Sequence, residues 1–237
     1  MEKRSLAIIT ARGGSKRIPR KNIKEFCGKP IIAYSIEAAL QSGVFEEVMV
    51  STDDEEIAEI AKKYGAKVPF MRSDETANDY ATTVDVIKEV IYEYEKRNYF
   101  FDTFCCIYPT APFLTANDLL KSKKILETGE YEAVVPVVRF SYPIQRALKE
   151  EDGFGVFRES EMMNARSQDL EAFYHDAGQF YWANTESFRE KQQFIGNRCK
   201  MFELSEIKVQ DIDTEEDWKM AELKYRLLQG EKNEFIS

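Results

Sequence analysis

The sequence predicts an α/β fold in which helices cover both faces of a mostly parallel sheet. From residue 6 to residue 138, apolar stretches of strand length alternate with amphipathic stretches of helix length. Such alternation is typical of parallel sheets, because each return to the same edge of the sheet needs a crossover, usually a helix. A chain of 237 residues is long enough for one large domain with a substantial core. We therefore expect a single domain over 1–237.

The predicted strands are short apolar stretches, most of them bounded by polar or turn-forming residues. The stretch 103–108 is typical of a buried central strand, and its neighbouring residues Cys105 and Cys106 are expected to be buried, reduced thiols. In chain order, the predicted strands are 6–9, 47–51, 67–70, 103–108, 133–138, 179–183 and 201–204.

The predicted helices combine apolar residues at three- and four-residue spacing with ordinary start and stop residues. Pro30 begins the first helix and Gly43 follows its end, while Thr115 and Thr214 each begin a capping box. In chain order, the predicted helices are 30–41, one from Asp53 or Asp54 to before Gly65, 81–96, one from Thr115 to before Gly129, 185–192 and 214–228.

Three stretches lack such patterns. The polar stretch 72–80 is predicted as a loop, and the tail 231–237 is expected to be frayed. The segment 139–174 is richer in polar and aromatic residues, contains two glycines and has no sustained period. We therefore interpret 139–174 as an excursion from the core sheet.

Composition excludes several classes of function. A net charge of -9 argues against nonspecific binding of nucleic acid, which needs an extended basic face. The longest apolar runs are strand-sized and the amino terminus has no continuous apolar segment, so we expect no membrane span and a cytoplasmic protein. His175 is the sole histidine and the four cysteines have no CxxC spacing, so a zinc site is not expected.

A basic loop, residues 11–24, follows the first predicted strand. Between Arg12 and Lys24 it carries six cationic side chains and no carboxylate, although the whole chain has a net charge of -9. In alternating α/β chains, a loop that follows a strand lies at the carboxyl edge of the sheet, where ligands bind. The basic loop therefore predicts a site for a small, highly charged anion.

The residue types of the basic loop favour a phosphate ligand. Gly13 and Gly14 would let a phosphate approach the backbone amides, and Arg12, Lys16 and Lys21 would add charge-assisted contacts. The alternative is an ordinary solvated basic face. The glycines oppose a regular basic helix, which favours the phosphate site over that alternative.

Two common nucleotide motifs, GxxxxGK[ST] and GxGxxG, are missing from the basic loop. Instead, residues 11–22, Ala-Arg-Gly-Gly-Ser-Lys-Arg-Ile-Pro-Arg-Lys-Asn, resemble the signature of the CMP-nonulosonic acid synthetases, also called acylneuraminate cytidylyltransferases. Every fixed position of that signature is met. The segments 28–36, 51–53 and 211–214 also resemble stretches of this family, so the resemblance covers nearly the whole chain.

The resemblance implies a Rossmann-like nucleotidyltransferase fold, similar to that of the glycosyltransferase A enzymes. It implies transfer of CMP from CTP to the anomeric hydroxyl of a nonulosonic acid, with release of pyrophosphate and Mg²⁺ as cofactor. It also implies a homodimer, in which 139–174 reaches the partner and helps to close the sugar site of that partner. The residues implied in nucleotide binding are Ala11, Arg12, Gly13, Gly14, Ser15, Lys16, Lys21, Asn22 and Arg72.

Asp211 and Asp213 are candidate metal ligands. If this stretch is extended, residues two apart face the same side, so both carboxylates project together. Mg²⁺ favours one or two carboxylates together with phosphates and waters. The alternative is that Asp213 merely stabilises the start of the following helix. The resemblance implies catalytic roles for this pair and for Arg12 and Lys21.

The sugar-binding residues implied by the resemblance are Tyr108, Arg166, Gln179 and Phe180. Tyr108 stands where the family usually has glutamine, and Arg166 aligns with the arginine that meets the sugar carboxylate, a role that suits a guanidinium. The stretches 14–24 and 175–181 look most like the pseudaminic acid branch of the family. Transfer to a neuraminic or legionaminic acid, and a nucleotide-binding regulator without activity, are the alternatives.

Overall fold

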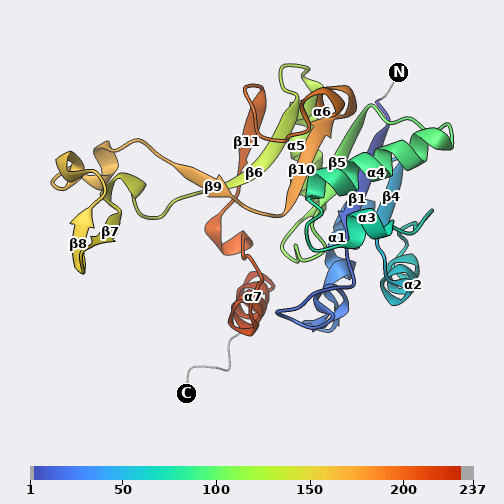
Figure 1. Ribbon diagram of the computed structural model, residues 1–237, viewed down its shortest axis with the longest axis horizontal. Coiled ribbons are helices and arrows are strands. Elements are labelled where there is room, and N and C mark those ends of the chain that lie inside the picture. Colours follow the sequence, from blue (N-terminus) through green and yellow to red (C-terminus); the bar gives the residue numbers. More distant parts are fainter. Residues whose placement is uncertain (1–2, 231–237) are drawn as a thin grey trace.

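A seven-stranded sheet forms the centre of the computed structural model, which describes residues 3–230 (Figure 1). The strand order is β11-β6-β10-β5-β1-β4, and β9 pairs with β6 outside this path. The strands of the sheet are β1 (Ser5–Thr10), β4 (Glu47–Ser51), β5 (Thr103–Ile107), β6 (Ala133–Arg139), β9 (Tyr174–Asp176), β10 (Phe180–Asn184) and β11 (Cys199–Glu203).

The predicted, mostly parallel sheet is confirmed. β1 lies between β4 and β5 and is parallel to both, and β11 is parallel to β6. β10 is antiparallel to both of its neighbours, β5 and β6, so these two strands share one direction. The carboxyl ends of β1, β4 and β5 therefore meet at one edge of the sheet, and the basic loop leaves β1 at this edge.

The predicted strand 67–70 is wrong. Only Lys67 bridges to Met49 of β4, donating to the carbonyl of Val48 and accepting from the amide of Val50. Pro69 has no N–H to donate, so the ladder does not continue. The predicted loop 72–80 contains one short helix, α3 (Asp74–Ala77).

Helices cover both faces of the sheet, as predicted. α1, α2 and α5 pack on one face, and α4 and α6 pack on the other. Threonine side chains cap the first turns of α4, α5 and α7, where their hydroxyls accept backbone N–H groups that have no partner within the helix. The longer helices are α1 (Ile31–Ser42), α2 (Glu55–Lys63), α4 (Thr83–Lys96), α5 (Ala116–Glu127), α6 (Thr185–Lys191) and α7 (Glu215–Leu228).

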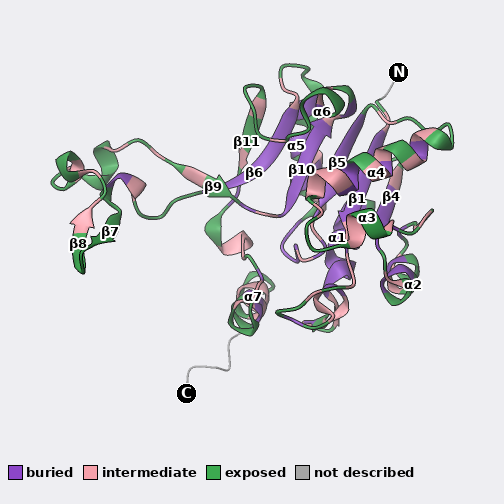
Figure 2. Cartoon of the chain, in the orientation of Figure 1, coloured by how far each residue is buried: buried purple, intermediate pink, exposed green. Residues whose placement is uncertain are grey.

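The core follows from the two-residue alternation of strand side chains. In β1, Ala7 and Ile9 face α1 and α2, while Leu6 and Ile8 face α4. Figure 2 shows that β1, β4, β5, β6 and β10 are buried along almost their whole length, whereas β9 and β11 are half-buried or exposed. Cys105 and Cys106 of β5 point to opposite faces and are fully buried, and burial raises the pKa of the Cys106 thiol to about 12.

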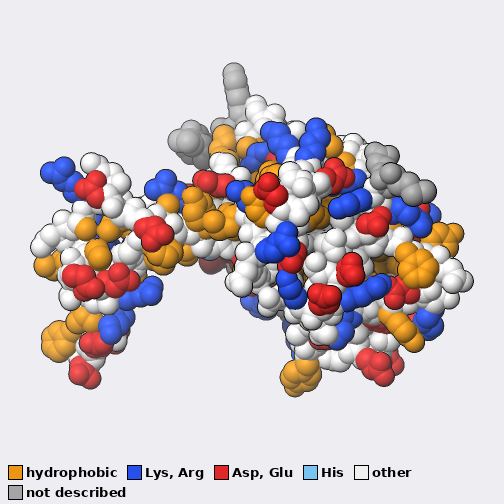
Figure 3. Space-filling view, turned by 90° about the horizontal axis from the view of Figure 1, so that it is seen from above, with side chains coloured by type: hydrophobic (Ala, Val, Ile, Leu, Met, Phe, Trp, Pro, Cys, Tyr) orange, Lys and Arg blue, Asp and Glu red, His pale blue; other side chains and the backbone are white. Residues whose placement is uncertain are grey.

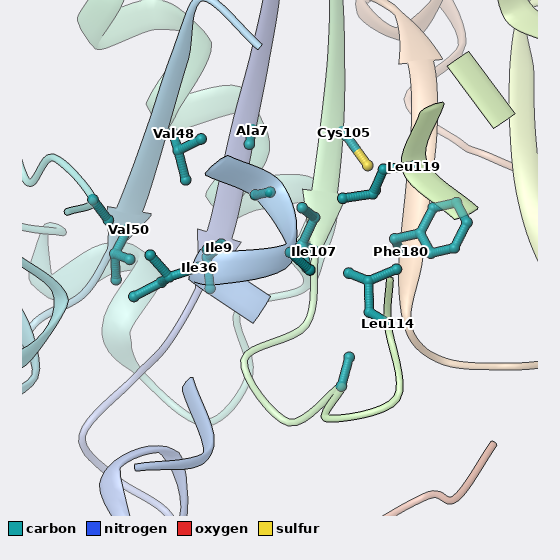
Figure 4. Packing of buried hydrophobic residues seen from close by; sticks show 14 of the residues in the cluster. Ala7, Ile9, Ile36, Val48, Val50, Cys105, Ile107, Leu114, Leu119 and Phe180 are labelled. Carbon is teal, nitrogen blue, oxygen red and sulfur yellow. The ribbon is translucent and has the colours of Figure 1, made fainter. Parts of the chain in front are cut away.

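Phe180 was expected to bind substrate, and the structure corrects this prediction. Its side chain is 0% exposed and packs among the apolar residues under α5, near Leu114 and Leu119 (Figure 4). β10 has sheet neighbours on both sides and helices over both faces, so alternate side chains enter one or the other half of the core. Phe180 therefore stabilises the fold and lies outside the surface that a ligand can reach.

A third apolar cluster fixes the end of the described chain. Trp218 and Ala221 of α7 pack against Ile18 of the basic loop and Phe26 of β2 (Glu25–Phe26), which pairs with β3 (Lys29–Pro30). The ring centroids of Phe26 and Trp218 lie 5.5 Å apart in an edge-to-face arrangement. This packing holds the start of α7 beside the basic loop. The 3-10 turn η1 (Lys21–Ile23) follows Ile18 in the chain and lies at the end of the basic loop.

The segment between β6 and β9 projects away from the sheet; we call residues 140–173 the arm (Figures 1 and 3). Its strands form a separate two-stranded hairpin, and most of its residues are exposed (Figure 2). The elements of the arm are η2 (Ile144–Arg146), β7 (Leu148–Glu151), β8 (Phe154–Phe157), η3 (Ser160–Met162) and η4 (Ser167–Asp169).

No helix within residues 3–230 is both long enough and apolar enough to span a bilayer. A last 3-10 turn, η5 (Glu206–Lys208), joins β11 to the segment that leads into α7. The predicted frayed tail, 231–237, lies outside the described residues.

Replacing Phe180 by alanine tests its place in the core. We expect Phe180→Ala to lower the free energy of unfolding by about 3–5 kcal/mol, because it removes a large buried side chain and leaves a cavity. The matched control is Phe100→Ala, since Phe100 is 57% exposed and should change stability by less than about 0.5 kcal/mol. Urea denaturation of both variants gives the comparison, and equal stabilities would contradict the core role.

Candidate active site

A cavity of about 530 Å³ opens where the basic loop leaves β1; we call it the first cavity. Its walls come from the basic loop, from the stretch between β4 and α4, from the first turns of α4 and from the residues after β5. The lining residues are Thr10, Arg12, Ser15, Lys16, Arg17, Ile18, Lys21, Asn22, Arg72, Thr76, Asn78, Asp79, Ala81, Thr82, Thr83, Val86, Tyr108, Pro109 and Thr110.

Six of the nine residues predicted to bind nucleotide line this cavity: Arg12, Ser15, Lys16, Lys21, Asn22 and Arg72. The other three have different positions. Ala11 is fully buried and donates its amide to the Ser51 carbonyl at 2.9 Å, which continues the pairing of β1 with β4. Gly13 and Gly14 belong to the basic loop but are not part of the cavity wall.

Gly13 packs closely on the turn after β4. A Cβ at this position would lie 2.8 Å from Asp54 Oδ2 and 3.0 Å from Asp54 Cβ, so a larger residue would force the Asp54 side chain to shift. Its amide donates to Asp53 Oδ1 at 2.9 Å, so this N–H already has a partner. This contact docks the basic loop on the turn after β4, and the role of Gly13 in binding a phosphate stays a prediction.

Arg12 and Lys16 converge on one carboxylate. Arg12 Nη1 donates to Asp79 Oδ1 at 2.8 Å, and Lys16 Nζ donates to Asp79 Oδ2 at 2.5 Å. Lys16 and then Arg12 hold the pKa of the Asp79 carboxyl below its ordinary value. The buried Asn22 donates its side-chain amide to the Arg12 carbonyl at 2.8 Å, which fixes the backbone of this part of the loop. The two cations therefore form a preformed anion site.

Arg72 supplies a buried cation to the wall of the first cavity. It is only 8% exposed, and its guanidinium donates to Ser51 Oγ at 3.1 Å and to the Ser51 carbonyl at 2.7 Å. No ion pair of Arg72 is found among residues 3–230, and burial lowers its pKa from the ordinary value. A buried cation whose contacts are neutral favours an anionic or strongly polar ligand beside it.

Asp213 lies against the basic loop. Its Oδ1 accepts from Arg17 at 2.8 Å and lies 3.5 Å from Lys21 Nζ, which also donates to the Ile212 carbonyl at 2.7 Å. The cap of α7 comes instead from Thr214 and Asp217, whose carboxylate also accepts from the Asp213 amide at 3.1 Å. These contacts do not support the alternative that Asp213 only stabilises the start of α7.

A second cavity, of about 470 Å³, adjoins the first, and Tyr108 lines both. Asp211 is exposed in its wall, whereas Ile212 is buried in the third apolar cluster. The segment 211–213 thus reaches from Lys21, in the wall of the first cavity, to the wall of the second. The lining residues are Tyr108, Val138, His175, Asp176, Ala177, Gly178, Tyr181, Glu206, Val209, Gln210, Asp211 and Lys224.

A chain of polar side chains runs along the second cavity from Tyr108 through Tyr181 to Asp176. The ring centroids of Tyr108 and Tyr181 lie 5.5 Å apart, and the Tyr181 hydroxyl donates to Asp176 Oδ2 at 2.7 Å. Asp176 Oδ1 accepts the Gly178 amide at 2.9 Å. Burial raises the pKa of both tyrosines, so they are neutral hydrogen-bond donors near neutral pH. The chain of three side chains offers fixed polar contacts to a hydroxyl-rich ligand.

The remaining predicted sugar-binding residues lie elsewhere. Gln179 is buried and donates its side-chain amide to the Lys208 carbonyl at 2.5 Å, so it holds β10 to the turn η5 and lines neither cavity. Phe180 is in the core. Arg166 is exposed on the arm and lines neither cavity of its own chain. Of the four predictions, only Tyr108 is in a cavity wall.

Sequence reasoning gave no binding role to three polar residues that the fold brings to these cavities. The resemblance placed Asp79 only in the loop on the nucleotide side, and Asp176 and Tyr181 belong to strands whose pairing the sequence does not specify. Alternation along β10 does not single out Tyr181, because Phe180 and Trp182 on one face and Tyr181 and Ala183 on the other all belong to apolar clusters. No local signal would have placed Asp79 opposite Arg12.

The carboxylates suit Mg²⁺ only together with a substrate. Within the described part of the chain, no three His, Cys, Asp or Glu side chains gather closely enough to hold a metal ion. Mg²⁺ rarely needs such a group, because it keeps several waters and takes oxygens from substrate phosphates. Asp211, in the wall of the second cavity, and Asp213, beside Lys21, carry hard oxygen atoms of the kind that such coordination would use.

Sequence comparison places the chain among known enzymes. A model of the cytidylyltransferase family matches residues 6–232. The chain is 43% identical, over 94% of its length and 97% of the relative, to pseudaminic acid cytidylyltransferase of Campylobacter jejuni subsp. jejuni strain 81-176. It is 34% identical, over 92% of its length and 95% of the relative, to CMP-N,N'-diacetyllegionaminic acid synthase of Legionella pneumophila.

Solved structures support the fold. CMP:2-keto-3-deoxy-manno-octonic acid synthetase complexed with CTP matches with a TM-score of 0.68, at 18% identity, over 96% of this chain and 99% of its own. The 4-diphosphocytidyl-2C-methyl-D-erythritol synthase of Anaerococcus prevotii matches with a TM-score of 0.65, at 15% identity, over 95% of this chain and 100% of its own. The predicted nucleotidyltransferase fold is confirmed. Because the family model covers nearly the whole chain and a relative of similar length is 43% identical, the chain belongs to the cytidylyltransferase family and is an enzyme.

Proposed function

We propose that the enzyme transfers CMP from CTP to the anomeric hydroxyl of pseudaminic acid, releasing pyrophosphate, and that it does so in the cytoplasm. The observation that carries this proposal is the pair of adjoining cavities that share Tyr108, one lined by cations and the other by hydroxyl and carboxylate groups. Such a pair suits one polyphosphate substrate and one sugar whose reacting atoms meet at the boundary. The 43% identity to a pseudaminic acid cytidylyltransferase supports the choice of sugar.

In this proposal the first cavity binds CTP. Arg12 and Lys16 contact the triphosphate from one side and Lys21 contacts it from another, while the buried Arg72 lies deeper in the wall. These fixed cations stabilise negative charge as it develops on the leaving pyrophosphate, and they need little reorganisation during the reaction. Neutralising the leaving group is therefore the main catalytic contribution of the basic loop.

Asp211 and Asp213 would hold Mg²⁺. When bound, the ion would polarise the phosphate oxygens and activate the sugar hydroxyl. Because Asp213 is paired with Arg17 and Lys21 in the ligand-free chain, its carboxylate changes partners when the nucleotide takes over these cations. This exchange couples the binding of the nucleotide to the availability of the carboxylate.

The second cavity binds the sugar in this proposal. Tyr108, Tyr181 and Asp176 offer hydrogen bonds to its hydroxyl and amide groups. Its wall also contains Glu206 and Asp211, so it is too acidic to hold a sugar carboxylate without additional positive charge. The wall has a single Lys or Arg among the described residues, Lys224, whose ammonium donates to the Val209 carbonyl at 2.8 Å.

A homodimer would supply the missing positive charge. The arm projects from the body of the chain and exposes large apolar side chains, notably Tyr142, Leu148 and Phe154. Exposed apolar groups on a projecting hairpin favour association with another surface. We therefore propose that each arm packs on a second copy and that Arg166 binds the sugar carboxylate in the partner's second cavity. Transfer to N,N'-diacetyllegionaminic acid is the second candidate function, favoured by the 34% identity to an enzyme of that name.

The proposed reaction is tested by pyrophosphate release from CTP with purified sugars. We expect turnover with CTP, Mg²⁺ and pseudaminic acid, and a kcat/KM at least about tenfold lower with N-acetylneuraminic or N,N'-diacetyllegionaminic acid, since fixed polar groups discriminate between stereoisomers. UTP, GTP and ATP serve as nucleotide controls. Faster turnover of the legionaminic acid would overturn the choice of sugar, and no release with any sugar would overturn the proposed reaction.

The metal assignment is tested by Asp211→Ala and Asp213→Ala. Each should lower kcat/KM by about 100-fold or more, because the ion is worth several kcal/mol of charge stabilisation in the transition state. Binding of Mn²⁺ in the presence of CTP, measured by electron paramagnetic resonance, should also weaken in both variants. The control is Glu216→Gln, an exposed carboxylate of the first turn of α7. Full activity of either alanine variant at limiting Mg²⁺ would show that the assignment is wrong.

The role of the arm is tested by mixing two impaired variants and measuring activity at a sugar concentration far below the raised KM. Arg166→Ala should raise the KM for the sugar about 10- to 100-fold, through loss of a charged hydrogen bond. If Arg166 acts in the partner's cavity, a mixed dimer of Arg166→Ala with Asp211→Ala contains one site with no lesion and regains activity. Arg158→Ala, on the same arm, is the control. A mixed dimer without recovered activity would place Arg166 in the site of its own chain, or in neither.

A further inference from the structure

Asp79 occupies the anion site that Arg12 and Lys16 form. Each of its carboxylate oxygens takes one of the two cations, at 2.8 Å and 2.5 Å. Two oxygens that share a charge and bridge two cations have the geometry that a phosphate would adopt at the same place. A side chain of the chain itself thus neutralises the two cations of the proposed polyphosphate site.

The loop that carries Asp79 has its own hydrogen bonds. Asn78 Oδ1 accepts the amides of Tyr80 and Ala81 at 2.8 Å and 3.1 Å, and Asn78 Nδ2 donates to the Glu75 carbonyl at 2.7 Å. The capping box of α4 begins directly afterwards, at Thr82. Because these bonds do not involve the carboxylate of Asp79, the loop keeps its shape whether or not that carboxylate is paired.

We propose that Asp79 is an internal counter-ion that competes with the triphosphate of CTP and with pyrophosphate for Arg12 and Lys16. This inference rests on the proposed function and adds a residue that sets the affinity of its polyphosphate site. The carboxylate and a polyphosphate repel one another and need the same two donors, so the ligand binds only as Asp79 gives them up. Once pyrophosphate begins to leave, Asp79 recovers both cations and favours its release.

The exposure of the pair makes such an exchange feasible. The side chains of Arg12, Lys16 and Asp79 are 39%, 77% and 43% exposed, and exposed ion pairs contribute little free energy. A polyphosphate brings several charges to the same donors and displaces one carboxylate. A merely structural role predicts the opposite effect of mutation: if Asp79 only positioned the two cations, its removal would weaken binding of the ligand.

The test is calorimetric titration of CTP, pyrophosphate and cytidine without sugar, at fixed Mg²⁺ and ionic strength. We expect Asp79→Asn to bind CTP and pyrophosphate about three- to tenfold more tightly than the natural chain, the range that the loss of weak, exposed ion pairs allows. Cytidine has no phosphate, so its affinity should not change, and it reports that the cavity is intact. In turnover assays, pyrophosphate should become a stronger product inhibitor by a similar factor.

The matched control is Asp74→Asn, which removes the same charge from an exposed position of α3. The inference would be overturned if Asp79→Asn bound both polyphosphates no more tightly than the natural chain. It would also be overturned if Asp74→Asn tightened binding as much as Asp79→Asn, because the effect would then come from net charge at long range. A natural chain that binds cytidine but neither polyphosphate would instead overturn the proposed function, and this inference with it.

Discussion

The structure depends on how acidic side chains neutralise the positive charge of the basic loop. Acids from distant segments pair with its cations: Asp79 with Arg12 and Lys16, and Asp213 with Arg17 and Lys21. Arg20 has a left-handed backbone, with φ 56, and pairs with Asp54, the N-cap of α2, and with Glu56 in the first turn of that helix. Apart from η1 the loop has no helix or strand, so these pairs and its buried anchors determine its course.

Two kinds of contact, which differ in strength, hold the basic loop in place: uncharged anchors and ion pairs. The uncharged anchors are the buried Asn22 amide, the close packing of the half-buried Gly13 on Asp54, and the buried Ile18 in the cluster with Trp218. Such contacts are costly to break, because they would leave buried polar groups unpaired or open a cavity. The ion pairs are mostly exposed and contribute little each. The backbone of the loop can therefore stay in place while its cations exchange a carboxylate for a phosphate.

Sequence patterns predicted the sheet, the helices and the loop, because each depends on local periodicity or on a contiguous motif. The failures have a common physical cause. The predicted strand 67–70 does not form because Pro69 has no N–H to donate, and a hydropathy pattern does not show this. β10 is apolar on both faces, so hydropathy could not decide whether Phe180 or Tyr181 faces a cavity. The positions of Asp79 and Asp176 depend on contacts between segments far apart in the chain, which no local pattern encodes.

In the proposed function, the negative charges around the second cavity make a single chain incomplete as an enzyme. Asp176 and Glu206 belong to its wall whatever the ligand, and Asp211 adds a third carboxylate. A sugar acid that enters with its own carboxylate would be repelled unless cations lie nearby. Four of the six cations of the basic loop line the first cavity and serve the triphosphate in the proposed function, while Arg20 and Lys24 pair with acids of α2 and α7. In that proposal, positive charge for the sugar would come from the second copy or from the metal ion. Binding of the sugar would then be conditional on assembly and on the nucleotide.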